Sequence, residues 1–105
     1  MMDNLNSKIT RVAEEAAQLC SPFQIFLVSQ KSNSKGELVS FKLCAVVSDE
    51  TDAAAMETKL LMNIDCDVPC DFIVYNVTDW NDCIDDDCSF AYRIDNQGVL
   101  LYGTR

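Results

Sequence analysis

The spacing of apolar residues near the start of the chain predicts an amphipathic helix. Between residues 5 and 19 they recur at steps of three and four, which places them on one face of a helix. They are Leu5, Ile9, Val12, Ala16 and Leu19. Ser21 precedes Pro22, and because the residue before a proline disfavours the helical conformation, the helix should end there.

Four apolar runs further along predict β-strands, at residues 25–28, 38–47, 71–76 and 99–102. The polar stretch 31–36 between the first two predicts a hairpin turn. Residues 48–52, up to Asp52, supply several candidate N-caps for a second helix that is predicted to end near residue 63. Thr78 and Ser89 are candidate caps of two shorter helices. This order predicts one α+β domain over residues 1–105, a two-layer structure with helices packed on one face of a mixed β-sheet.

Composition limits the partners of this domain. The 105 residues carry a net charge of −9, which repels phosphate backbones and anionic membranes. We therefore expect neither nucleic acid nor a membrane as partner. The lack of a long apolar run and the polar first residues argue against a membrane span and a signal peptide, so a cytoplasmic location is expected. The chain has no histidine, which excludes Ser-His-Asp and Cys-His catalysis.

Six cysteines are better explained as reduced thiols in apolar surroundings than as a metal or redox site. Cys20 ends the helical stripe and Cys44 lies within a strand. The spacings Cys66-x3-Cys70 and Cys83-x4-Cys88 lack the two-residue gap of a zinc knuckle or thioredoxin motif. A thiol module built on Cys66 and Cys70 is kept as a minor hypothesis.

Two further features could serve a function, and we favour a structural interpretation for each. The aspartates between residues 79 and 87 resemble a calcium loop in composition, but Ile84 and Phe90 stand where an EF-hand needs Gly and Glu. We expect a solvated acidic loop. Trp80 could anchor a partner, but we expect it to cap the core.

Several local sequences, in order, resemble the minimal nucleotidyltransferase domain of the DNA polymerase β-like superfamily. Leu27-Val28-Ser29 is similar to the strand that ends in Phe-Gly-Ser, and Ser40-Phe41-Lys42-Leu43 to the strand with Ser-Asp-x-Asp. Residues 70–74 resemble the strand with the third aspartate, here Asp71, and residues 93–102 resemble the closing Ile…Gly-x-x-Leu-Tyr segment. The resemblance covers almost the whole chain and implies the same α+β fold.

The chain departs from this family at the positions of the metal-binding carboxylates. Three carboxylates on neighbouring strands would hold two Mg²⁺ ions. Phe41 and Leu43 occupy two of those positions and cannot bind metal. Ser29 and Asp71 are what remains of the family's site, so we expect no catalytic residues and no cofactor.

The function expected from the sequence is that of a non-catalytic nucleotidyltransferase-like domain acting through protein–protein contacts. Whether it retains enzymatic activity is left open, leaning to none. The alternative is a nucleotide-binding or weakly active metal-dependent nucleotidyltransferase, which would need Mg²⁺ and carboxylates from elsewhere, such as Glu37, Asp49 or Asp65. The family often pairs with itself or with a helical partner, so the resemblance implies a homodimer or a protein partner. The apolar strand 99–102 is the expected contact, because an unpaired strand edge is a template for another chain.

Overall fold

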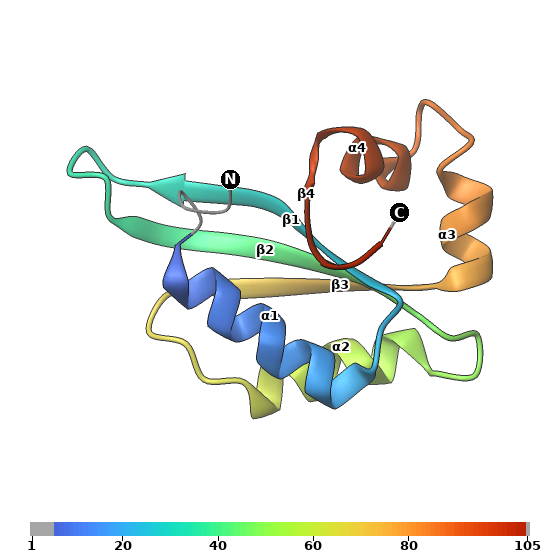
Figure 1. Cartoon of the computed structure of the whole chain (residues 1–105), viewed down its shortest axis with the longest axis horizontal. Helices are drawn as coiled ribbons and strands as arrows, with labels where there is room; N and C mark the ends of the chain where they lie inside the picture. Colours follow the sequence, from blue (N-terminus) through green and yellow to red (C-terminus); the bar gives the residue numbers. More distant parts are fainter. Residues whose placement is uncertain (1–5, 105) are drawn as a thin grey trace.

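Four strands form one mixed sheet in the order β3-β2-β1-β4 (Figure 1). The structure is a computed structural model, and it describes residues 6–104. The strands are β1 (Gln24–Ser32), β2 (Leu38–Val47), β3 (Cys70–Asn76) and β4 (Val99–Gly103). β1 pairs in antiparallel fashion with β2 and β4, whereas β2 and β3 run parallel. The α+β class and the mixed sheet predicted from the sequence are confirmed.

The hairpin between β1 and β2 is longer than the apolar pattern indicated. Polar residues continue β1 to Ser32, because each finds a partner on β2, as Lys31 does opposite Ser40. The turn is held by the side chain of Asn33, whose Oδ1 accepts hydrogen bonds from the backbone N–H groups of Lys35 and Glu37. Gly36 adopts φ +79°, a conformation that glycine reaches without steric cost.

Helices α1 (Ser7–Cys20) and α2 (Ala53–Asn63) match their predicted positions. Asn6 and Asp52 cap their N-termini, each accepting a backbone hydrogen bond within the first turn. The predicted stripe of α1 is buried at Ile9, Val12 and Ala16, while Leu5 lies outside the described residues. The helices within residues 6–104 are all too short or too polar to cross a membrane.

The two shorter helices are α3 (Val77–Cys83) and α4 (Phe90–Gln97). Ser89 caps α4 as predicted, since its side chain accepts from the backbone N–H of Tyr92. The prediction that Thr78 caps α3 is wrong, because Thr78 is the second residue of that helix. Asp49 does the capping instead: its carboxylate accepts from both the backbone N–H and the hydroxyl of Thr78. The hydrogen bonds from Thr78 lower the pKa of Asp49.

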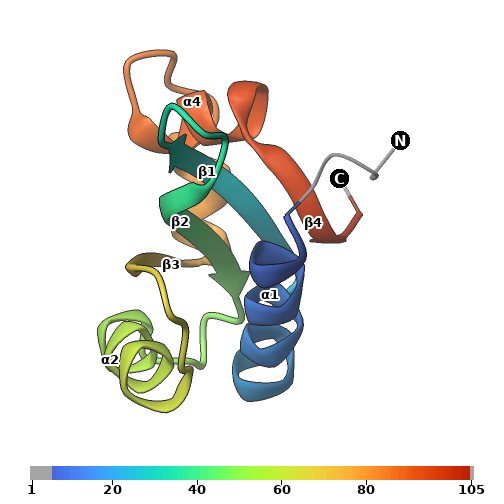
Figure 2. The same ribbon diagram turned by 90° about the vertical axis from the view of Figure 1, so that its left-hand side faces the viewer.

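Helices pack on both faces of the sheet, which corrects the expectation of helices on one face (Figures 1 and 2). Helices α1 and α2 pack on the strand residues that include Leu27, Leu43 and Val74. Residues of α3 and α4 form a second core with Phe26, Cys44 and Val46. Because β2 is apolar on both sides over its second half, each face there needs a cover.

Candidate functional site

Ser29 and Asp71, the two site residues expected from the sequence, lie in one row across the sheet. Ser29 of β1 is opposite Lys42 of β2, and Lys42 is opposite Asp71 of β3. Directly paired residues of adjacent strands point to the same face of a sheet, with strands about 4.8 Å apart. Ser29 and Asp71, which are far apart in the sequence, therefore flank the ammonium-bearing Lys42.

A β-bulge determines that Ser29 takes part in this row. The register between β1 and β2 shifts between Leu27 and Ser29, so Val28 is the extra residue. A slip of one residue moves every later side chain to the other face of the strand. Beyond the bulge, Ser29 and Lys31 consequently face the same side as Lys42.

Ser29, Lys31, Ser40, Lys42 and Asp71 line a depression of about 180 Å³, and we call these five residues the polar sheet face. They lie on the same face as the core of α3 and α4, because residues two apart on a strand share a face, as Lys42 and Cys44 do on β2 and Asp71 and Ile73 on β3. Helices α3 and α4 cover the other end of these strands (Figure 1). The polar sheet face is therefore the part of this face that they leave uncovered.

Phe41 and Leu43 lie on the opposite face from Asp71. Their side chains are 3% and 1% exposed and pack in the core beneath α1 and α2. Phe41 is opposite Cys70 and Leu43 is opposite Phe72, so the parallel register turns Asp71 away from both. Mg²⁺ requires several oxygen ligands converging on one point, and these residues do not fit a two-metal site.

The carboxylates named from the sequence as alternative metal ligands, Glu37, Asp49 and Asp65, lie elsewhere. Glu37 accepts a hydrogen bond from the side chain of Asn33 in the hairpin, and Asp49 caps α3. Asp65 lies in the connection between α2 and β3, where it lines a different pocket. None of the three lines the depression beside Asp71.

Within residues 6–104, one group of three side chains is close enough to share a metal ion: Asp86, Asp87 and Cys88. All three are exposed. Asp86 accepts from the backbone N–H of Cys88, which organises the turn before α4. This agrees with the solvated acidic loop expected from the sequence.

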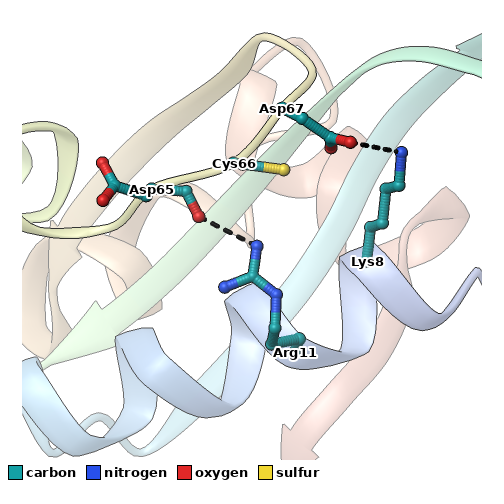
Figure 3. Close-up of a pocket in the computed structure, with 5 residues that line it drawn as sticks. All are labelled: Lys8, Arg11, Asp65, Cys66 and Asp67. Atoms are coloured by element: carbon teal, nitrogen blue, oxygen red, sulfur yellow. Dashed lines mark hydrogen bonds and ion pairs between the residues drawn. The ribbon is translucent and has the colours of Figure 1, made fainter.

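Polar groups that line the pocket between α1 and the α2–β3 connection bond to one another across it (Figure 3). The Nζ of Lys8 lies 2.9 Å from a carboxylate oxygen of Asp67, and Arg11 donates to the backbone carbonyl of Asp65 at 2.8 Å. The hydrogen bond from Lys8 lowers the pKa of Asp67. These contacts tie α1 to the connection, so we interpret the pocket as structural.

The six cysteines are all free thiols. Cys20 and Cys44 are buried, as expected for small apolar residues, and Cys88 is exposed. Cys66 and Cys70 both line a pocket beside α2. Burial raises the pKa of Cys70 to about 12, which makes its thiol a poor nucleophile near neutral pH.

Trp80 belongs to the core rather than to a binding surface. It is 3% exposed, with its ring stacked 5.3 Å from that of Phe26 and edge-on to Tyr75 at 5.4 Å. It cannot anchor a partner without leaving this cluster.

Lys31, Ser40 and Lys42 were not recognised from the sequence as parts of a site. The sequence did hold a signal: Ser40 and Lys42 alternate with the apolar residues Val39, Phe41 and Leu43, which predicts a polar face of β2. The position of that face between Ser29 and Asp71 depends on strand order and on the bulge.

No family model, curated protein or solved structure matches this chain. The resemblance to the nucleotidyltransferase domain thus stays a prediction from local sequence and element order.

Proposed function

We propose that this chain is a nucleotidyltransferase-like domain that has lost catalysis and acts through contacts with another protein chain. One observation supports the proposal: Phe41 and Leu43, at the two positions where the resemblance would place carboxylates, are buried in the core on the face opposite Asp71. A single carboxylate cannot neutralise the charge that develops in phosphoryl transfer with two metal ions.

The test is a transfer assay with purified protein, Mg²⁺ and labelled nucleoside triphosphates. We expect no transfer above the background reaction. Transfer at enzyme-level rates that Asp71→Asn abolishes would contradict the proposal and support the metal-dependent alternative. Asp79→Asn is the matched control, because Asp79 is also an exposed carboxylate but lies in α3, away from the depression.

The contact surface that we propose is the outer edge of β4, and the partner a second copy of this chain. Within residues 6–104, β4 pairs with β1 and with no other strand, so one side of its backbone lacks a strand partner. Its residues, Val99–Gly103, include neither a charge nor a proline, two features that protect edges from pairing. It has one protecting feature, a bulge near Leu101.

The opposite edge of the sheet is less available. The backbone N–H of Val74 in β3 donates to the Glu57 carboxylate at 2.9 Å, so a side chain of α2 occupies that edge. A second strand would have to displace this carboxylate before it could pair with β3. The comparison of the two edges favours β4.

Light scattering over a tenfold dilution series tests the dimer, which we expect to dissociate on dilution. Val99→Lys should shift the equilibrium to monomer, because an edge lysine opposes strand pairing. Val99 suits this test better than Leu100 or Leu101, which pack against the two cores. Val39→Lys is the control, since Val39 is 46% exposed against 44% for Val99 but lies in the hairpin. A constant monomer mass at the highest concentration would contradict the proposal.

A further inference from the structure

Two lysines share the uncovered polar sheet face without a bonded counter-charge. The ion pairs among residues 6–104 are Lys8–Asp67 and Arg11–Glu15. The ammonium groups of Lys31 and Lys42 have no hydrogen-bond or ion-pair partner within the described part of the chain. Lys42 is half-buried and Lys31 is exposed.

The register brings these two lysines close to each other. Lys31 is opposite Ser40, and Lys42 is opposite Ser29, so the lysines are diagonal neighbours on adjacent antiparallel strands. Diagonal neighbours have Cα atoms roughly 7–8 Å apart, well within reach of two long side chains. Two like charges in such positions repel, and an anion between them would relieve the repulsion.

This basic region stands out against the acidity of the chain. Residues 29–42 contain Lys31, Lys35 and Lys42 but one acidic residue, Glu37, whereas the whole chain has a net charge of −9. The hydroxyls of Ser29 and Ser40 add hydrogen-bond donors beside the two ammonium groups. Ammonium and hydroxyl donors on one surface are the chemistry that binds oxyanions.

The size of the depression limits the ligand. Its volume of about 180 Å³ is below the roughly 300–1,000 Å³ of pockets that hold organic ligands. A small hydrated ion fits better than a nucleotide. Asp71 lies at the end of the row and repels a neighbouring anion, so it should weaken binding.

We propose that the polar sheet face binds a small oxyanion of the phosphate class between Lys31 and Lys42, with Ser29 and Ser40 donating hydrogen bonds. This site is independent of the proposed contact at β4 and does not require catalysis. It assigns Asp71 a role opposite to that of a metal ligand, because removal of its charge should strengthen binding.

Titration of the ¹⁵N-labelled protein with inorganic phosphate at constant ionic strength tests the site. We expect saturable amide shifts at residues 29–31 and 40–42. Lys42→Gln should weaken binding about two- to fivefold, the effect of removing one partly exposed charge pair. Lys31→Gln is the second variant, in case Lys42→Gln disturbs the sheet. Asp71→Asn should strengthen binding.

Lys59→Gln is the control, since it removes the same charge from α2, away from the depression. Absence of saturable shifts at these residues would overturn the proposal, as would an equal loss of affinity in Lys59→Gln. Binding of a nucleoside triphosphate that requires both Mg²⁺ and Asp71 would also overturn it.

Discussion

Gly98 lies where the end of α4 meets β1, and no side chain fits there. A Cβ at this position would lie 2.6 Å from the carbonyl oxygen of Ile94 and 3.1 Å from that of Leu27. Both atoms belong to backbone that cannot shift without disturbing an element. Gly98 is also the glycine of the closing segment that resembles the nucleotidyltransferase family, so close packing explains its presence.

Gly98→Ala should therefore destabilise the protein by about 1–3 kcal/mol, the usual cost of overpacking. Urea unfolding followed by circular dichroism measures the change. Gln97→Ala, at the exposed neighbouring position, should change stability by less than about 0.5 kcal/mol. Equal stability of the two variants would show that the junction has more room than the structure indicates.

The thiol of Cys44 makes stability depend on alkaline pH. Burial raises its pKa from 9.0 to about 12, so the folded protein keeps a proton that the unfolded chain loses. The stabilisation is complete below about pH 9 and is lost as the pH rises towards the folded pKa.

The free energy of unfolding should therefore fall between about pH 8 and about pH 10, and the fall should be about 1 kcal/mol smaller in Cys44→Ala. Urea unfolding at the two pH values measures this difference. Cys88→Ala is the control, because Cys88 is exposed, and it should retain the full pH dependence. An unchanged pH dependence in Cys44→Ala would show that the Cys44 thiol does not cause the loss of stability at alkaline pH.

At the scale of elements, α2 protects the edge strand β3 through Glu57. The carboxylate of Glu57 accepts the outward N–H of Val74, which no strand satisfies. Replacing it by alanine leaves a partly buried donor unpaired, which costs about 1–3 kcal/mol. The same change opens an edge to pairing with other chains.

Glu57→Ala should thus lower stability by that amount and increase aggregation, measured by urea unfolding and by light scattering. Glu57→Gln should cost less, since its side-chain carbonyl still accepts a hydrogen bond. Glu50→Ala removes an equivalent exposed charge in the preceding loop and should have little effect. The assignment fails if Glu57→Ala behaves like Glu50→Ala.

For the molecule as a whole, the arrangement of two cores on one sheet predicts a single unfolding transition. Phe26 and Leu27 are neighbours on β1 but belong to different cores, and β2 is shared in the same way. Loss of either core removes the support of strands that the other needs, so the two should unfold together.

Trp80 is the one tryptophan of the chain and reports on the core of α3 and α4. Its fluorescence and the far-ultraviolet circular dichroism should follow the same urea transition. A fluorescence change at distinctly lower urea would indicate that α3 and α4 unfold as a separate unit.

The sequence by itself determined which elements form. The stripe of α1, the caps Asp52 and Ser89, and the long apolar run of β2 are local signals, and each element appears where its signal lies. Local hydrogen bonds and side-chain periodicity suffice for such predictions. The cap of α3 was missed because its capping residue, Asp49, is remote in the sequence.

Tertiary structure decided how the elements cover the sheet and which residues meet. A second core beneath α3 and α4 forms because Cys44 and Val46 make the other face of β2 apolar in its second half, whereas Ser40 and Lys42 make the same face polar in its first half. The row from Ser29 through Lys42 to Asp71 requires the strand order and the bulge at Val28. The same parallel register turns Phe41 and Leu43 away from Asp71. Side chains of different strands share a face only when the register between the strands allows it, and register is a property of the folded sheet.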